Sequence, residues 1–346
     1  MRKSFLMLGM AVAALTSCTQ SEVLEIAESR VIGFDSFVGK HTRTAHKIEQ
    51  TGTQDNDLNK FYVFGKTTQG NTTDDLFNQR LCTYNGTGFT YDNPETWALN
   101  TTYNFAAYSN GNGQLTSGVT HELVGTTGSK LTFSNYTVGD KDLLAAINTP
   151  YVVNEVSQIP QTVALPFQHL LSCVRITITN ASQNLYLKFG NITINAIGTD
   201  NCTYQINNGT KTCVWENTTS TASAASATQK AYTFNAPTTN DGYVAPGASF
   251  QDMCFFIPQS NDLSFSVNIE TYEKTTSNGV DTYEKKDFTT STASLKINDH
   301  AVWQPGYQYN YAASVAGTLH YIRFSATVDS WTPKESALGG ITPSQD

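Results

Sequence analysis

Charged side chains are scarce in this chain of 346 residues, where they make up only 14% of the sequence. The 29 acidic residues outnumber the 21 basic ones, which gives a formal charge of −8. No cluster of basic residues breaks this acidic balance, so the composition argues against nucleic acid as a partner. Beyond the first fifteen residues there is also no apolar run long enough to span a bilayer as a helix.

Catalytic and metal-binding motifs are missing as well. The sequence contains no His-x-x-x-His or Cys-x-x-Cys pair, no Gly-x-Ser-x-Gly elbow and no phosphate-binding glycine loop. The nearest pair of histidines, His41 and His46, stands beside Arg43 and Lys47, whose positive charges would repel a metal ion. We therefore predict that the protein is not an enzyme and holds neither a metal nor a cofactor.

The N-terminus has the pattern of an export signal. Arg2 and Lys3 precede a charge-free run from Ser4 to Leu15, which is too short for a mature transmembrane helix but fits a signal peptide. The following Leu15-Thr16-Ser17-Cys18 resembles the lipobox of bacterial lipoproteins. This resemblance implies that residues 1–17 are removed and that Cys18 carries lipid, because several acyl chains together make a stable membrane anchor. The alternative is an ordinary signal peptide with a chance cysteine.

Five cysteines remain after Cys18, and an odd number does not make a complete disulfide framework. Cys202 and Cys213 flank Asn207-Asn208-Gly209-Thr210, a turn signal that predicts a β-hairpin and could place the two cysteines opposite each other. Whether they form a disulfide is left open. The other three stand in apolar strand contexts and are expected to be buried thiols: Cys82, Cys173 and Cys254.

Alternation of apolar and polar side chains is the main structural signal. It predicts strands with one buried face, and no segment of similar length shows a helical period. Aromatic residues, at 11%, suit such pleated surfaces. We predict an all-β fold, with a long hairpin turning at Asn278-Gly279. The clearest alternating segments are Val31–Val38, Val174–Ile178, Leu263–Ile269 and Ile322–Val328.

The expected organisation is two β-sandwiches in series after an acidic tether. Residues 18–30 form the tether, and two prolines, Pro160 and Pro166, bracket the most plausible boundary. This gives an N-terminal domain of residues 31–163 and a C-terminal domain of residues 164–346, both of ordinary domain size.

Several short motifs, taken in order, resemble the fimbrillin family of the Bacteroidales, whose members are pilins and anchor or tip subunits of lipoprotein-derived (type V) pili. Each motif is weak alone, and their order across nearly the whole chain carries the resemblance. They are Ile32-Gly33-Phe34-Asp35-Ser36-Phe37-Val38 with Thr42-Arg43-Thr44, the run from Cys82 to Tyr108, Asp142-Leu143-Leu144-Ala145-Ala146, Leu165 to Ser172, Trp303 to Tyr309, and Val328-Asp329-Ser330-Trp331.

The resemblance implies two tandem transthyretin-like β-sandwich domains and assembly by exchange of strands. A protease would cut between Arg43 and Thr44, the first strand, Val31–Val38, would leave, and a neighbouring subunit would donate a strand to the open edge. Residues 322–331 and the tail to Asp346 would include that donor region. The alternatives are that Arg43 is a plain surface arginine, or that Arg30 is cut instead, which would leave the first strand in place.

The partners implied are other pilus subunits, the outer membrane through the lipid, and a host or bacterial surface ligand. A rival hypothesis is a non-polymerising surface lipoprotein that binds glycan or protein, since aromatic faces stack on sugars. The candidates for that role are Trp97, Trp215, Trp303 and Trp331, although core packing is the usual fate of tryptophan. His169 is expected to be a core histidine. Whether the subunit is shaft, anchor or tip is left open.

Overall fold

The structure is a computed structural model that describes residues 30–38, 58–111, 113–115, 118–125, 128–207, 209–217, 228–237, 239–297, 300–316 and 322–330. These residues form twenty strands and two short 3₁₀ helices, η1 (Val156–Gln158) and η2 (Thr239–Gly242), with no α-helix among them. The all-β prediction is confirmed. None of the helices in these segments has the length and apolar character needed to cross a membrane.

The first sheet closes on itself. Seven strands follow one another as hydrogen-bonded neighbours, and the ring closes because β2 pairs with both β3 and β5. In ring order the strands are β2 (Lys60–Gln69), β3 (Thr72–Tyr84), β4 (Phe89–Thr90), β1 (Phe34–Val38), β10 (Val163–His169), β8 (Leu144–Ile147) and β5 (Thr101–Ser109). An eighth strand, β9 (Tyr151–Val153), pairs with the beginning of β5.

The inside of this ring is an aromatic core of its own. Phe61, Phe77, Trp97 and Phe105 are each no more than 2% exposed and belong to one cluster with Phe34. The alternate residues of β5 point out of the ring, where Tyr108 joins a second, larger core. Both faces of β5 are therefore covered, and its residues are buried at nearly every position although four of the nine are polar.

The larger core lies between two further sheets. One has the order β18-β17-β12-β7-β6 and the other the order β16-β11-β19-β20, and three shorter strands also pair with β12. The first sheet comprises β6 (Val119–Val124), β7 (Gly128–Thr137), β12 (Leu185–Asn207), β17 (Ser264–Ser277) and β18 (Val280–Ser294). The second sheet comprises β11 (Ser172–Asn180), β16 (Ser249–Phe256), β19 (Tyr307–Val315) and β20 (Ser325–Ser330). The three shorter strands that also pair with β12 are β13 (Thr210–Trp215), β14 (Thr228–Thr233) and β15 (Tyr243–Val244).

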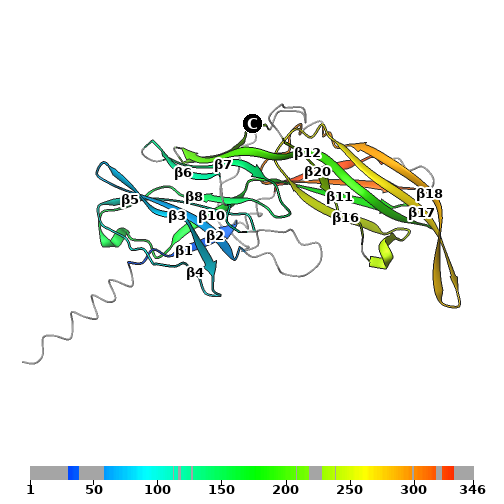
Figure 1. Cartoon of the computed structure of the whole chain (residues 1–346), viewed down its shortest axis with the longest axis horizontal. Helices are drawn as coiled ribbons and strands as arrows, with labels where there is room; N and C mark the ends of the chain where they lie inside the picture. The colour runs from blue at the N-terminus through cyan, green and yellow to red at the C-terminus, as the bar shows by residue number, and fades with distance from the viewer. Residues whose placement is uncertain are drawn as a thin grey trace, which may run out of the picture.

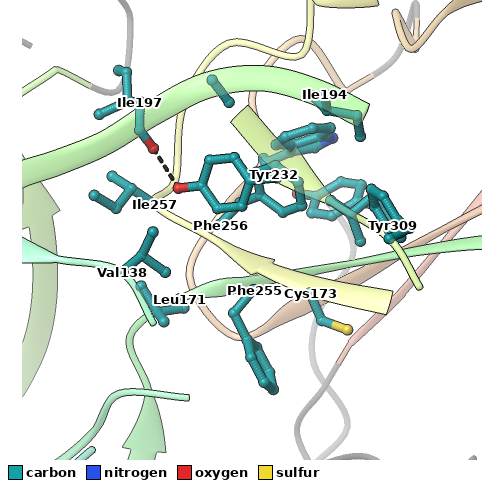
Figure 2. Packing of buried hydrophobic residues seen from close by; sticks show 14 of the residues in the cluster. Val138, Leu171, Cys173, Ile194, Ile197, Tyr232, Phe255, Phe256, Ile257 and Tyr309 are labelled. Atoms are coloured by element: carbon teal, nitrogen blue, oxygen red, sulfur yellow. Dashed lines mark hydrogen bonds between the residues drawn. The ribbon is translucent and has the colours of Figure 1, made fainter. Parts of the chain in front are cut away.

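Figure 2 shows how tightly this core is packed around Tyr232. The ring of Tyr232 stacks on Phe256 with the centroids 4.0 Å apart, and its hydroxyl donates a hydrogen bond of 2.5 Å to the carbonyl of Ile197. A buried hydroxyl without a partner would cost free energy, so this bond allows a tyrosine to take a core position.

The 23-residue strand β12 links parts of the chain that lie on either side of the expected domain boundary. Its first half pairs with β17, which follows the boundary in the sequence. Its second half pairs with β7, which precedes the boundary. In Figure 1 the ring strands gather at one end of the molecule, β17 and β18 reach the other, and β12 runs between them. The boundary after residue 163 coincides with the start of β10, a ring strand. The sheets therefore do not separate there, and the division into two domains stays a prediction.

The long hairpin predicted at Asn278-Gly279 is confirmed. Strands β17 and β18 pair up to Ser277 and Val280, and the two turn residues have positive φ values of 52° and 77°. Such a two-residue turn matches the twist of the strands and suits Asn-Gly. The alternation in β17 is also confirmed, since Phe265, Val267 and Ile269 are fully buried.

Candidate functional site

Strand β1 lies in the closed ring between β10 and β4. It runs parallel to β10, from Phe34 beside Val163 to Val38 beside Phe167, but it meets β4 at the single pair Phe34–Phe89. Just before the strand, Val163 donates a backbone hydrogen bond of 2.7 Å to the carbonyl of Gly33. These bonds are made by the backbone, so any extended segment in the same place could make them.

The side chain of Phe34 occupies an aromatic slot inside the ring. Its centroid lies 6.2 Å from that of Phe61, 5.6 Å from those of Phe77 and Phe105, and 5.7 Å from that of Tyr91. Ile32 and Phe34 are 0% and 3% exposed. Full burial of such side chains stabilises a fold by roughly 1.5–3 kcal/mol each. We refer to Phe61, Phe77, Tyr91 and Phe105 as the aromatic slot.

Loss of β1 would open the ring at one place. The edges of β10 and β4 would then present unpaired N–H and C=O groups, and the aromatic slot would face water. An exposed edge of this kind is a template for another strand, whose alternate side chains can enter the vacated positions. The arrangement can therefore bind an extended chain, provided that it carries bulky apolar side chains in the right register.

Arg30, the competing processing site, is tied down by the fold. Its carbonyl accepts a hydrogen bond of 2.8 Å from the backbone of Trp97, and the next residue, Val31, bridges to Thr96. Proteolytic cutting concentrates in segments free of such pairing, so the structure disfavours Arg30. Cys18, Arg43 and Thr44 lie outside the described residues, and the predictions made for them stay predictions.

Three of the four tryptophans proposed as sugar-binding residues are buried. Trp97, Trp215 and Trp303 are 2%, 1% and 0% exposed, so the hypothesis that they stack on a glycan is wrong. They fill the two cores instead, where large aromatic side chains contribute most to burial. Trp331 lies outside the part of the chain that the structure describes.

His169 was expected to be a core histidine; it lies at the edge of the core, with 10% of its side chain exposed. Its Nδ1 contacts a carboxylate oxygen of Asp142, whose side chain is 0% exposed. Burial raises the pKa of Asp142, and the neighbouring His169 acts in the opposite direction. The pair holds the start of β8 against the end of β10, where Leu170 also donates a backbone hydrogen bond to Leu143. We assign it a structural role.

Cys202 and Cys213 lie on paired strands but two residues out of register. Cys202 faces Trp215 and Cys213 faces Tyr204, so the cysteines are diagonal neighbours rather than opposite each other. Their sulfurs are 3.7 Å apart, without a bond between them in this structure. Burial raises the pKa of Cys202, which disfavours its reactive thiolate. The hairpin prediction is confirmed, whereas the disulfide stays a prediction. Cys82 and Cys173 are buried, and Cys254 is half-buried.

A group of four tyrosines on the outer face of the β12–β17–β18 sheet was not predicted from the sequence. Tyr243 stacks on Tyr283 with centroids 3.9 Å apart, while Tyr186 lies 5.3 Å from Tyr283 and Tyr272 lies 5.0 Å from Tyr243. All four are partly exposed. Consecutive members of the group stand 57, 29 and 11 residues apart in the sequence. Only the pairing of the strands reveals that they lie together. We call it the tyrosine cluster.

No group of three or more His, Cys, Asp or Glu side chains within the described ranges is placed to hold a metal ion. The described residues offer three features for recognition and packing: the backbone of β10 beside β1, the aromatic slot and the tyrosine cluster.

No curated protein matches the sequence. Among solved structures, a fimbrial protein from Bacteroides vulgatus is similar with a TM-score of 0.54 at 15% identity, over 88% of this chain and 100% of that one. A candidate cell adhesion protein from Bacteroides uniformis gives a TM-score of 0.46 at 14% identity, over 87% and 98% of the two chains.

A sequence model described as fimbrillin-like matches residues 42–331, which is well over half of the chain. That span covers all the strands except β1 and all the core residues except Ile32 and Phe34. The chain belongs to the fimbrillin-like family.

Proposed function

We propose that this protein is a pilus subunit of the bacterial cell surface that assembles by exchanging β1 for a strand of a neighbouring subunit and serves adhesion. The observation that carries the proposal is the place of β1. It is a short strand that completes a ring, and its Phe34 side chain occupies a slot that a side chain of another strand could fill. Export with a lipid on Cys18 would bring the subunit to the outer membrane before assembly.

The energetics support exchange rather than simple loss of β1. Removing the strand exposes the aromatic slot and two sheet edges, and burial of Ile32 and Phe34 alone is worth about 3–6 kcal/mol. A subunit with an empty slot is therefore strongly driven to bind a replacement strand. Cutting after Arg43 would remove both β1 and the lipid, so that processing would release the subunit and prepare it for assembly in a single step.

The N-terminus of the protein recovered from cells tests the proposal. We expect an N-terminus at Thr44, together with ladders that resist SDS, because exchanged strands are buried on both sides. The substitution Arg43→Ala should abolish both, while Arg30→Ala should leave both unchanged. Acylated Cys18 as the only N-terminus, with a chain that stays monomeric after trypsin, would contradict polymerisation.

A second candidate function is a surface lipoprotein that binds a glycan or protein ligand without polymerising. The tyrosine cluster is the observation that favours it, because partly exposed tyrosines provide rigid contact area in many interfaces. Under this proposal Tyr243→Ala and Tyr283→Ala should each weaken attachment of cells to their target without changing the N-terminus. Unchanged attachment in both variants would remove the cluster from consideration.

A further inference from the structure

Tyr243 and Tyr283 lie face to face within the tyrosine cluster. Their ring centroids are 3.9 Å apart and their planes differ by only 9°. Both side chains are partly exposed, so an oxidant from solution can reach them. At this separation carbons of one ring are in van der Waals contact with carbons of the other, at about 3.5–4.0 Å. We propose that the pair is an oxidative cross-linking site, at which a carbon–carbon bond joins the two side chains into dityrosine.

The two rings come from strands that are not neighbours. Tyr243 begins β15 and pairs with Lys188 on β12, whereas Tyr283 lies on β18 and pairs with Lys274 on β17. Strands β12 and β17 pair with each other, so they lie between β15 and β18. A bond between the rings would therefore tie β15 to the hairpin of β17 and β18 across two strands. This inference goes beyond the proposed function and does not depend on it, because it involves neither β1 nor Arg43.

Local contacts hold each ring in place. The ammonium group of Lys188 lies 5.2 Å from the centroid of the Tyr243 ring, within the range of a cation–π interaction. Beside Tyr283, Lys274 Nζ on β17 lies 2.7 Å from Asp281 Oδ2 on β18, which links the two strands of the hairpin. Rings held together in this way couple within one molecule, and such a reaction is faster than coupling between molecules.

The coupling step is a two-electron oxidation, and its co-reactant is hydrogen peroxide used by a haem peroxidase. Each phenol gives up one electron and its hydroxyl proton, which leaves a phenoxyl radical whose unpaired electron is shared with the Cε carbons. The two radicals form one bond between a Cε carbon of each ring. The hydrogen on each of these carbons then moves to the oxygen and restores the phenol. The protein thus loses two hydrogen atoms, and one peroxide becomes two molecules of water.

The neighbouring pairs in the cluster are less suited to this bond. Tyr186 meets Tyr283 edge to face at 77°, and Tyr272 meets Tyr243 in the same way at 84°. The new bond forms from orbitals perpendicular to the ring planes. Stacked rings direct these orbitals at each other, whereas rings at right angles do not. The geometry therefore selects the stacked pair from the four tyrosines.

A second stacked pair of tyrosines lies in a different environment. The rings of Tyr62 and Tyr108 are 5.4 Å apart at 24°, but Tyr108 is 0% exposed. Its hydroxyl donates a hydrogen bond of 2.7 Å to Gln79 Oε1, and burial raises its pKa to about 12. An oxidant in solution does not reach this ring, so the pair is expected to stay unlinked.

Peroxidase treatment of the full chain in dilute solution tests the site. We would measure the fluorescence of dityrosine in the monomer fraction, together with the loss of two hydrogen atoms in the intact mass. Trypsin cuts after lysine and arginine, so Tyr243 falls in the peptide of residues 231–274 and Tyr283 in that of residues 275–285. Tyr283 is the only tyrosine of its peptide. We expect these two peptides to be linked, and fragmentation to place the link on Tyr243.

The variants Tyr243→Phe and Tyr283→Phe keep a ring in the stack but cannot form the phenoxyl radical there. Each should lower the yield of dityrosine in monomers to about a tenth of the parent's yield or less, because the partner ring then has no radical beside it. Tyr186→Phe is the matched control, since this ring also contacts Tyr283 but stands edge-on. Its yield should stay within about twofold of the parent's.

Dityrosine found only in dimers, or kept in the monomers of both single variants, would overturn the assigned pair. The peptide map of the parent protein decides the same question without any variant. Tyr243 and Tyr283 stand 40 residues apart in the sequence, so their link closes a long loop in the unfolded chain. The linked chain should unfold roughly 5 °C above the unlinked one. Equal transition temperatures would overturn the conclusion that the bond fixes the hairpin to β15.

Discussion

His121 is the residue whose titration should govern part of the acid stability of the protein. It is buried on β6, where its Nε2 lies 2.5 Å from Ser129 Oγ and its Nδ1 has no hydrogen-bond partner. Burial, assisted by Lys66, lowers its pKa from 6.5 to about 4, while Asp75 and Glu122 act in the opposite direction. A histidine in this setting is stable only in its neutral form.

Between pH 6.5 and about 4, the unfolded chain therefore binds more protons at His121 than the folded chain does. The free energy of unfolding should fall across this window by up to about 3 kcal/mol as the pH is lowered, and this contribution should level off below it. Urea unfolding at a series of pH values measures the effect. His121→Leu should flatten this window, and His300→Gln, at an exposed position, should not. An unchanged slope in His121→Leu would assign the acid dependence to other groups.

Among the elements, strand β7 leaves no room for a side chain at its first residue, Gly128. A Cβ on Gly128 would lie 2.3 Å from the carbonyl oxygen of Val124 and 3.0 Å from that of Ile206. The first contact is with β6 and the second with β12. Strand β7 can therefore pair with both strands only if residue 128 has no side chain. Backbone atoms cannot move aside as a flexible side chain can.

We expect Gly128→Ala to lower the free energy of unfolding by about 1–3 kcal/mol, because the added methyl group pushes the paired strands apart. Gly190→Ala is the matched control, since it also lies in this sheet and a Cβ there would meet nothing within 4 Å. Its effect should stay within about 0.5 kcal/mol. The midpoints of urea unfolding compare the two, and an equal loss in both would mean that glycine flexibility, rather than close packing, explains the effect.

At the scale of the whole molecule, β12 joins the ring to the distal hairpin. Its second half pairs with β7, whose end of the sheet lies toward the ring. Its first half pairs with β17, which extends to the opposite end of the molecule. The larger core likewise contains Tyr108 from β5 together with Phe265 and Trp303 from the second half of the chain. Neither half can lose its fold without exposing apolar surface of the other.

The described part of the chain should therefore unfold in one cooperative step rather than two. In calorimetry the measured enthalpy should equal the van 't Hoff enthalpy, and the substitution Phe34→Ala, made only in the ring, should lower the single transition temperature as a whole. Two separate transitions, of which Phe34→Ala shifts one, would instead support two independent sandwiches in series.

Local patterns in the sequence predicted the strands well. The alternation in residues 263–269 correctly assigned Phe265, Val267 and Ile269 to the core, and Asn278-Gly279 correctly located a hairpin. The candidate site was predicted only in outline. Val31–Val38 was expected to be the exchangeable strand on the strength of a family resemblance, but nothing in those residues indicated the slot formed by Phe61, Phe77, Tyr91 and Phe105.

The physical reason is that strand alternation depends on residues close together in the sequence, whereas strand pairing depends on residues far apart. Which side chains of a strand point inward depends on its own period of two, so it can be read from neighbouring residues. Which strand lies beside which depends on contacts between distant segments. Examples are the pairing of Phe34 with Val163 in the ring, and that of residues 193–206 of β12 with β7 and β14. The closed ring, the slot that β1 fills and the sheet that joins the two ends of the molecule therefore exist only in the folded chain.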